Sequence, residues 1–151
     1  MTLSLCLLFY ALFPSAQVKG ASEDDSCTLH IQVENIEKAE GHLLVAIFNK
    51  EGGFPEAGGE IFGAAFAIEH APNMQIEVPH LKPGRYAVAL YHDLNGNNKL
   101  DKNVMGIPVE PYGFSNNPKV KWSPPSFEKA SFEFGPNLSN IQITLNRWKR
   151  H

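Results

Sequence analysis

The feature that most constrains the fold is a two-residue period of apolar side chains, which recurs in short segments along most of the chain. Leu29, Ile31 and Val33 alternate with polar residues, and the same period, with polar or small residues between, recurs at 74–78, 86–90, 130–134 and 141–145. Since successive side chains of a β-strand point to opposite faces, this period predicts strands with one buried face. Residues 43–48 are apolar throughout, which predicts a central strand covered on both faces.

The spacing of these segments predicts the class of fold. A further short strand is expected at 66–69, which makes about seven strands separated by turns rich in Gly and Pro. No repeat divides the chain, and 43% hydrophobic residues among 151 suffice for one core. We therefore expect an all-β protein, a single antiparallel β-sandwich of immunoglobulin or transthyretin type, over residues 21–151. A short helical turn within 60–67 is an alternative for that segment, and no long amphipathic helix is expected.

The N-terminus has the pattern of an export signal. Residues 3–13 are nearly all apolar, which matches a signal-peptide core and is too short for a bilayer span of about 20 apolar residues. Small residues follow, so cleavage is expected after Ala16 or after Gly20. No Lys or Arg precedes Leu3, which departs from the usual basic start. We expect residues 1–20 to be a signal peptide, the mature protein to be periplasmic or extracellular, and its chain to lack a transmembrane segment.

The charge of the chain argues against nucleic acid as a partner. The net charge is −3 and no long basic run occurs, whereas nucleic-acid binding needs a basic surface. The small basic tail at 147–151 is interpreted as a solvated end. Cys27 is the only cysteine after the expected leader, so no internal disulfide is expected, and we interpret it as an inert residue beginning the first strand.

Two segments without a strand pattern are long, at 49–63 and at 93–125. Loops of this length are uncommon in compact domains and are often functional. Aromatic residues gather in or beside them: Phe54, Phe62, Tyr112, Phe114, Trp122 and Phe127. The simpler interpretation is that these rings cover the sandwich, while an exposed remainder would suit a sugar or a protein partner.

A turn with a strong local pattern joins two of the expected strands. Pro83 suits the second position of a type II turn, and Gly84 is expected to supply the positive φ of the third. Residues 81–88, Leu-Lys-Pro-Gly-Arg-Tyr-Ala-Val, resemble a turn found widely in transthyretin-like β-sandwiches. The turn supports the fold and indicates no function.

The sharpest chemical signal is the run from Asp93 to Asp101. Oxygen-bearing side chains fall at relative positions 1, 3, 5 and 9, and the carbonyl of Lys99 lies at position 7. This is the oxygen spacing of the first part of a calcium-binding loop. The Ca²⁺ ligands that it predicts are Asp93, Asn95, Asn97, Lys99 and Asp101.

Two departures from that pattern leave a metal-free alternative open. Position 6 is Asn98 where calcium loops have Gly, and position 12 is Val104, so the bidentate Glu is missing. Glu110 would replace it only if the loop folded back. Asn and Asp also form Asx-turns with their own backbone, so a polar turn without metal competes with the calcium site.

Catalytic patterns are weak in this chain. No two of the six histidines are spaced to form a metal pair on one strand face, and Ser115 lacks a Gly-x-Ser-x-Gly elbow. His92 and Asp93 are adjacent, so a strand would point them to opposite faces. We expect no enzyme. The rival hypothesis is a small hydrolase-type site assembled at one end of the sandwich from His92, Asp93, Glu110 and Tyr112.

The segment around this loop carries a specific resemblance. Asp93-Leu-Asn-Gly-Asn is followed by Gly-Ile-Pro at 106–108, by Glu110 and by Tyr-Gly-Phe-Ser-Asn-Asn at 112–117. With Gly-His-Leu at 41–43, the turn at 83–86 and a closing strand at 127–130, the chain resembles the bacterial family called domain of unknown function 2141 over nearly the whole mature length. Asn98 stands where that family commonly has Gly, and Val-Glu-Pro at 109–111 where Thr-Glu-Gly is commoner. The resemblance implies a small exported β-sandwich and no activity.

Together these patterns lead to one functional expectation. The chain is expected to be an exported, non-catalytic binding or accessory module of the bacterial cell envelope, with the loop at 93–125 as its site. The expected partner is an envelope protein or a glycan, and a purely structural envelope protein is a further alternative. The other candidate residues of the loop are His92, Glu110, Tyr112, Phe114 and Asn116.

Overall fold

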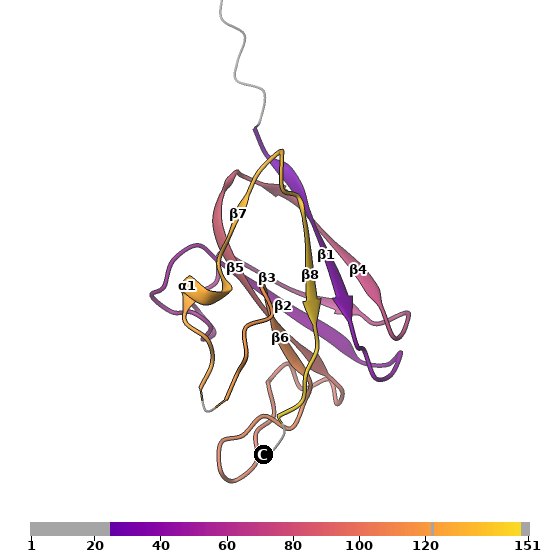
Figure 1. The fold of residues 1–151 in the computed structure, drawn as a ribbon. Coiled ribbons are helices and arrows are strands. Elements are labelled where there is room, and N and C mark those ends of the chain that lie inside the picture. Colours follow the sequence, from indigo (N-terminus) through magenta and orange to yellow (C-terminus); the bar gives the residue numbers. More distant parts are fainter. Residues whose placement is uncertain (1–24, 122, 149–151) are drawn as a thin grey trace, which may run out of the picture.

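The computed structural model describes residues 25–121 and 123–148, which form two β-sheets packed face to face (Figure 1). The strands are β1 (Cys27–Glu34), β2 (His42–Phe48), β3 (Phe62–Ala67), β4 (Met74–Leu81), β5 (Gly84–Asp93), β6 (Tyr112–Phe114), β7 (Phe132–Phe134) and β8 (Asn140–Thr144), and one helical turn, α1 (Phe127–Ala130), precedes β7. One sheet has the order β4-β1-β8 and the other β3-β2-β5-β6, with β7 also paired to β5. The expected all-β sandwich is confirmed. The expected leader, residues 1–20, lies outside the described residues.

The two-residue period buries one face of each main strand between the sheets. Leu29, Ile31 and Val33 of β1 are 0% exposed, and they meet Ile47 of β2 and Val88 of β5 in the same core. Complete burial of one such side chain contributes about 1.5–3 kcal/mol. β2 lies between β3 and β5, as its continuous apolar run predicted.

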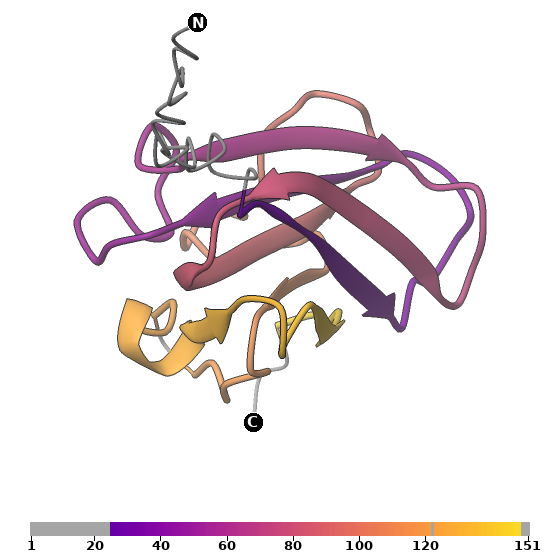
Figure 2. The ribbon, with the colours of Figure 1, turned by 90° about the horizontal axis from the view of Figure 1, so that it is seen from above.

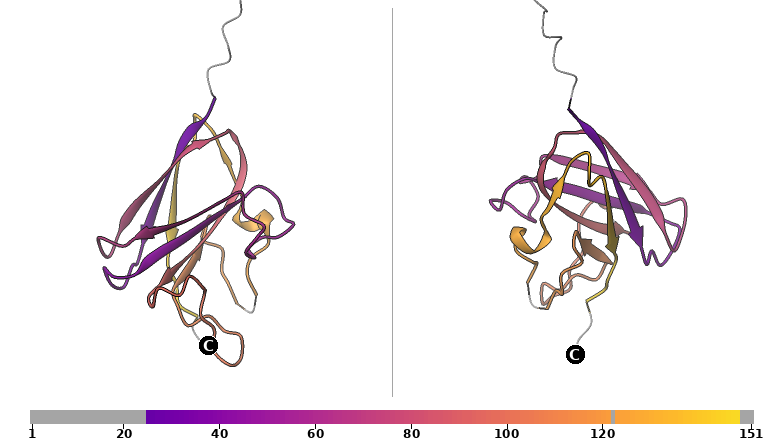
Figure 3. Two further views of the ribbon diagram at one scale, coloured as in Figure 1. Left: turned by 180° about the vertical axis from the view of Figure 1, so that it is seen from behind. Right: turned by 45° about the horizontal axis from the view of Figure 1, so that its top comes forward.

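The five-stranded sheet is also covered on its outer face. Phe54, from the segment between β2 and β3, packs edge-to-face against Phe48, Phe114 and Phe127 with ring centroids 5.1, 6.0 and 6.0 Å away. Figure 3 shows this segment beside α1 on the same side of the sheet. Phe54, Tyr112, Phe114 and Phe127 therefore belong to a second apolar cluster, and Phe62 packs against the main core, so these rings cover the sandwich as the simpler interpretation predicted. Trp122 lies outside the described residues.

β8 runs parallel to β1, whereas the other strand pairs of the described chain are antiparallel. After β7 pairs with β5, the chain crosses to the other sheet and enters β8 alongside β1 (Figure 1). The sandwich is thus antiparallel except at this pair. Apolar periodicity carries no information about strand direction, so this pair could not be predicted from it.

Two expected elements differ in the structure. The segment at 60–67 is not helical, because β3 occupies Phe62–Ala67 and pairs with β2 along its length. The closing strand expected at 127–130 is the helical turn α1, and the strand expected at 130–134 is shortened to β7. In α1, Phe127 and Ala130 are the buried pair. This spacing of three residues turns both side chains toward the sheet.

The turn before β5 is not the type II turn that its sequence suggested. Gly84 is absent from the described residues with positive φ, whereas His80 has φ 59°. Gly84 already belongs to β5, where it pairs with Phe134 of β7. The hydroxyl of Tyr86 donates to the Lys82 carbonyl at 2.9 Å and so holds the turn through a side chain.

One edge of β5 is shared by two short strands, and Ser115 fills the gap between them. β7 pairs with 84–86 and β6 with 89–91. Between these stretches, the Val88 N–H donates to Ser115 Oγ at 2.8 Å, and the Val88 carbonyl accepts from the Ser115 N–H at 3.0 Å. Ser115 Oγ also donates to the Ala130 carbonyl of α1, and the residue is 0% exposed. Ser115 is therefore bound into the fold.

We expect Ser115→Ala to lower the free energy of unfolding by about 1–3 kcal/mol, because the buried Val88 N–H and Ala130 carbonyl would lose their partner. Denaturant unfolding measures the change. The matched control is Ser131→Ala, whose hydroxyl also donates to a carbonyl but at an exposed site, and which should change stability by less than about 0.5 kcal/mol. Equal losses for the two variants would contradict this account of Ser115.

Candidate functional site

The loop that follows β5 is organised by the carboxylate of Asp93. This side chain is 0% exposed. Its Oδ1 accepts the backbone N–H groups of Gly96 at 2.8 Å and Asn97 at 3.3 Å, and its Oδ2 accepts that of Asn98 at 2.8 Å. Gly96 and Asn98 have φ of 73° and 58°, so both adopt the left-handed conformation, which Gly and Asn tolerate. The chain therefore turns around one buried carboxylate.

Two asparagines of the loop point their amides at Asp101. Asn95 Nδ2 donates to Asp101 Oδ2 at 2.6 Å, and Asn97 Nδ2 donates to Asp101 Oδ1 at 2.9 Å. Their oxygens form Asx-turns, because Asn95 Oδ1 accepts the Asn97 N–H and Asn97 Oδ1 accepts the Lys99 N–H. Three of the four predicted side-chain ligands are therefore in direct contact with one another. Asp93 bonds instead to the backbone that surrounds it.

Glu110 folds back to the start of the loop, where its carboxylate bonds to backbone N–H groups. A short hairpin makes the return, with Lys102 opposite Pro108 and the Val109 N–H donating to the Asp101 carbonyl at 2.9 Å. Glu110 is 4% exposed, and its Oε1 and Oε2 accept the N–H groups of Leu94 and Asp101, both at 3.0 Å. The carboxylate thus clamps the two ends of the turn.

His92 does not join the other residues of the rival catalytic hypothesis. It is 0% exposed, and its Nε2 lies 2.7 Å from the Glu40 carbonyl. In β5 it follows Val88 and Leu90 at two-residue intervals, so its ring lies on the face of the strand that forms the main core. Asp93 lies on the opposite face, as adjacent strand residues must. Its Nε2 is bonded to Glu40, and its Nδ1 has no hydrogen-bond partner among the described residues. The ring is therefore not hydrogen-bonded to Asp93 or Glu110.

Tyr91 is a neighbour of this loop that sequence reasoning missed. Burial, together with the negative charges of Asp93, Glu110 and Asp101, raises the pKa of its hydroxyl to about 12. The phenol is therefore neutral at physiological pH. Alternation along β5 could have suggested it, because Tyr91 and Asp93 share a face of the strand.

The donor atoms of the loop fit a calcium ion only in part. Within residues 25–121 and 123–148, no group of three His, Cys, Asp or Glu side chains is placed to hold a metal ion. Asp101, Asn95 and Asn97 converge, and a rotation of the two amides would exchange their nitrogens for oxygens. The carbonyl of Lys99 and water would have to complete the six to eight oxygens that calcium takes.

The conspicuous Tyr-Gly-Phe-Ser-Asn-Asn segment ties separate elements together. Asn116 and Asn117 have φ of 65° and 47°. Asn116 Nδ2 donates to the carbonyls of Ser131 at 2.7 Å and Lys129 at 3.3 Å, at the end of α1. The amide of Asn117 donates to the Gln142 carbonyl and accepts the Thr144 N–H, as a neighbouring strand would. Asn116, a candidate from the sequence, thus holds the segment to the end of α1, and Asn117 holds it to β8.

Gly113, in the same segment, is required by a close approach of β8. A Cβ at this position would lie 2.7 Å from Ile143 Cγ2 and 3.1 Å from the Thr144 carbonyl oxygen. Beside it, Tyr112 exchanges both backbone hydrogen bonds with Asn146, at 3.0 and 2.8 Å. β6 and the chain after β8 are thereby held together, and their junction forms the floor of a groove.

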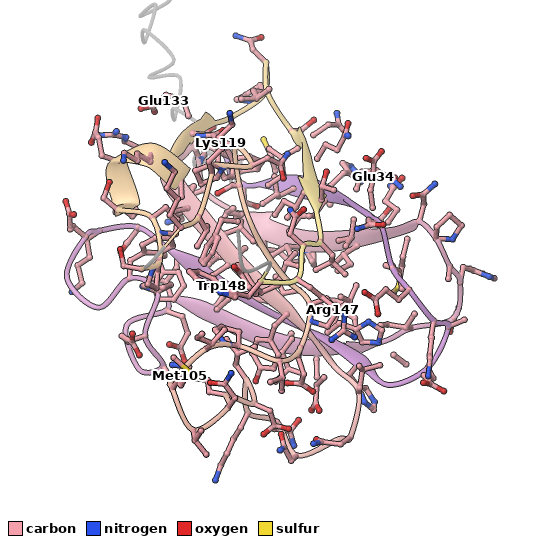
Figure 4. All side chains as sticks on the ribbon, turned by 60° about the horizontal axis from the view of Figure 1, so that its bottom comes forward. Glu34, Met105, Lys119, Glu133, Arg147 and Trp148 are labelled. Atoms are coloured by element: carbon pink, nitrogen blue, oxygen red, sulfur yellow. The ribbon has the colours of Figure 1, made fainter. Side chains whose placement is uncertain are left out.

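This groove has a volume of about 920 Å³ and lies between the hairpin at 102–109, β6, the segment at 117–121 and the end of the described chain. Its apolar lining comes from Met105, Ile107, Tyr112, Phe114, Val120 and Trp148, and its cations are Lys119, Lys121 and Arg147. Figure 4 shows Met105, Lys119, Arg147 and Trp148 on one side of the molecule. Of the sequence-predicted candidates, Tyr112 and Phe114 line the groove, whereas His92, Asp93 and Glu110 do not.

Arg147 connects the groove to the hairpin. Its guanidinium donates to Glu37 Oε1 at 2.7 Å and Oε2 at 2.8 Å, and to the Val109 carbonyl. The hydrogen bond from Arg147 lowers the pKa of Glu37. The sequence interpretation of 147–151 as a solvated basic end missed this contact, because Glu37 and Arg147 are distant in sequence. Lys149, Arg150 and His151 lie outside the described residues.

A second hollow, of about 550 Å³, lies under the loop between β2 and β3. It is lined largely by glycines and exposed polar residues, among them Gly52, Gly58 and Lys50. Since few side chains face it, it offers little for specific recognition. The groove beside β6 is the better candidate site.

The fold and this groove define a small β-sandwich module with a mixed apolar and cationic groove at one sheet edge. The chain belongs to the DUF2141 family, described as "Uncharacterized protein conserved in bacteria", whose model matches residues 31–142. The family resemblance seen in the sequence is thereby confirmed. No curated protein and no solved structure matches the chain. Among the helices of the described chain, none has the length and apolarity to cross a membrane.

We expect Glu110→Gln to destabilise the protein by about 1–3 kcal/mol, since the amide can replace only one of the two buried acceptor oxygens and leaves one backbone N–H unsatisfied. Thermal or denaturant unfolding measures this loss. Glu51→Gln removes the same charge at an exposed position of another loop and should have little effect. If both variants have the same unfolding midpoint as the native protein, Glu110 does not clamp the loop.

Proposed function

We propose that this protein is an exported, non-catalytic binding module that holds an acidic, partly apolar segment of an envelope protein in the groove beside β6. The observation that carries the proposal is the composition of that groove, where Met105 and Trp148 lie together with Lys119 and Arg147. Aromatic residues, Met and Arg are enriched in binding interfaces. A volume of about 920 Å³ is within the range of ligand sites.

The charge of the groove favours an acidic partner. Lys119 and Lys121 are exposed, and within the described chain neither forms an ion pair. Arg147 is paired with Glu37 but remains part of the lining. Since the net charge of the chain is −3, these cations are a local exception on an acidic protein. Complementary charge would steer an acidic segment to this side.

The arrangement of the acidic residues supports binding over catalysis. Asp93 and Glu110 are buried, and their carboxylate oxygens accept hydrogen bonds from backbone N–H groups. His92 lies on the other face of β5. Tyr112 is the one member of the rival catalytic set that lines the groove. A general acid or base must come within hydrogen-bond reach of its substrate, and these carboxylates do not line the groove.

Export is supported by the N-terminal sequence. Residues 3–13 form an apolar core followed by small residues, so the mature protein is proposed to begin after Ala16 or Gly20. The envelope or the extracellular space would then be where it meets its partner. The second part of the proposal is that the loop binds Ca²⁺, which is abundant in that space. Asp101, Asn95 and Asn97 support it, because their side chains are already in contact.

The groove is tested by affinity capture from envelope extracts of the native host, with the tagged full chain produced in that host and its N-terminus sequenced. We expect Trp148→Ala, and Lys119→Glu with Lys121→Glu, to lose a protein that the native chain retains. The matched control, Lys50→Glu with Lys82→Glu, reverses two exposed charges elsewhere and should retain it. Capture that is equal for all variants, or capture of a glycan instead of a protein, would contradict the proposed partner.

The calcium part is tested by thermal unfolding with millimolar Ca²⁺ and with chelator. A site with so few charged ligands is expected to bind with a Kd of about 10⁻⁴–10⁻³ M. At ten times that Kd, binding adds about 1.4 kcal/mol, or a rise of about 3–5 °C in Tm. Asp101→Asn should reduce the rise, whereas the distant Glu56→Gln should keep it. If calcium does not change the Tm of the native protein, the calcium part of the proposal is wrong and the loop is a set of Asx-turns.

A further inference from the structure

β3 forms an outer edge of the five-stranded sheet, and within residues 25–121 and 123–148 it pairs with β2 alone (Figure 2). A strand at an edge presents unpaired N–H and C=O groups that can accept a further strand. Natural proteins commonly protect such edges with charged side chains, Pro, or a covering segment. The sequence of β3, Phe-Gly-Ala-Ala-Phe-Ala, contains neither a charge nor a Pro.

Other edges of the sandwich are protected. The far side of β8 is bonded to the side-chain amide of Asn117, which takes the Gln142 carbonyl and the Thr144 N–H. The far side of β6 is bonded to Asn146. The outer strand of the smaller sheet, β4, carries Glu77 and Pro79. β3 is therefore exceptional among these edges.

The backbone groups that β3 turns outward can be identified from its pairing. The Ile68 N–H donates to the Gly41 carbonyl, so residue 68 faces the β2 side. In an antiparallel ladder, hydrogen-bonding direction alternates from residue to residue. Phe66 and Ala64 therefore also face β2, and Gly63, Ala65 and Ala67 direct their N–H and C=O groups away from it.

We propose that this edge pairs with β3 of a second copy of the chain, antiparallel and centred on Ala65, to form a two-fold symmetric dimer with one continuous sheet. Ala65 would face its own counterpart, and Gly63 would face Ala67 at each end. Each such pair exchanges two hydrogen bonds, which makes about six across the interface. All the outward-facing groups of Gly63, Ala65 and Ala67 would then be satisfied.

The side chains of β3 suit this self-pairing. On the core side of the sheet, the register places the small Ala64 opposite the large Phe66 of the other copy. Phe62 and Phe66 are only partly buried in the single chain, so pairing would cover more of both rings. On the outer side, Gly63, Ala65 and Ala67 carry at most a methyl group, and the only side chain close to a Cβ placed on Gly63 is that of Glu60, which the Gly58 N–H holds back through Oε2. This complementarity favours a second copy over a strand of unrelated sequence.

The dimer goes beyond the proposed function and is independent of it. The sheet order β3-β2-β5-β6 puts β3 and the groove beside β6 at opposite edges of one sheet. Pairing through β3 would therefore leave both grooves open, and a dimer would present two binding sites to its partner.

The mass of the full chain in solution tests the dimer, by size exclusion with light scattering over a range of concentrations. We expect a concentration-dependent doubling of the mass. Ala65→Lys puts a charge at the centre of the edge and should return the mass to that of one chain. Gln75→Lys adds the same charge on β4 and should leave the dimer intact. A native chain that stays monomeric at all concentrations, or equal effects of the two variants, would overturn the proposal.

A cross-link tests the register even if Ala65→Lys fails to fold. With Cys6 and Cys27 replaced by Ser, Ala65→Cys would be the only thiol. Its two copies would have Cα atoms about 5.5 Å apart, within the range of a disulfide. Ala67→Cys would place its copies about 14 Å apart, which is too far. We expect mild oxidation to join the first variant at least tenfold faster than the second, and equal rates would overturn the proposed pairing.

Discussion

The pairing of β5 is the constraint on which the rest of the structure depends. Residues 87–93 of this ten-residue strand pair with β2 on one side, while β6 and β7 divide the other side between them. On that second side the division leaves Val88 without a strand partner, and Ser115 supplies both a backbone and a side-chain hydrogen bond there. Because the same hydroxyl reaches the Ala130 carbonyl, α1 is held against the sheet by the contact that completes β5.

The end of β5 also determines where the groove lies. Asp93 turns the chain around its carboxylate, and Glu110 clamps the two ends of that turn. The hairpin at 102–109 is thereby held beside β6, where Met105 and Ile107 become one side of the groove. A buried carboxylate is costly unless its oxygens are hydrogen-bonded, and here backbone N–H groups provide the bonds. Asp93, which begins the polar run that resembles a calcium loop, therefore has a structural role in the turn.

The residues that carry the family resemblance are mostly those that hold the chain in place. Gly113, Ser115 and Asn117 serve close packing or hydrogen bonding, and Asp93 and Glu110 shape the turn. The groove takes Met105, Lys119 and Trp148 from outside those motifs. Strong local patterns predicted the loop as the candidate site, but they pointed to its oxygens rather than to the apolar and cationic surface beside it. Tyr112 and Phe114 of the motifs also line that surface, but its other members come from separate segments, so no single motif marks the surface as a whole.

The sequence by itself determined the all-β sandwich, the buried face of each main strand and the central position of β2, because alternation along a strand is a local property. It also determined that His92 and Asp93 would face opposite sides. Only the tertiary structure decided that β8 runs parallel to β1, that Gly84 begins β5 rather than forming a type II turn, and that residues 127–130 form a helical turn. It likewise decided that Arg147 pairs with Glu37 and that Glu110 returns to Leu94. Each of these depends on which distant backbone groups need a partner, and a linear sequence records no such distances.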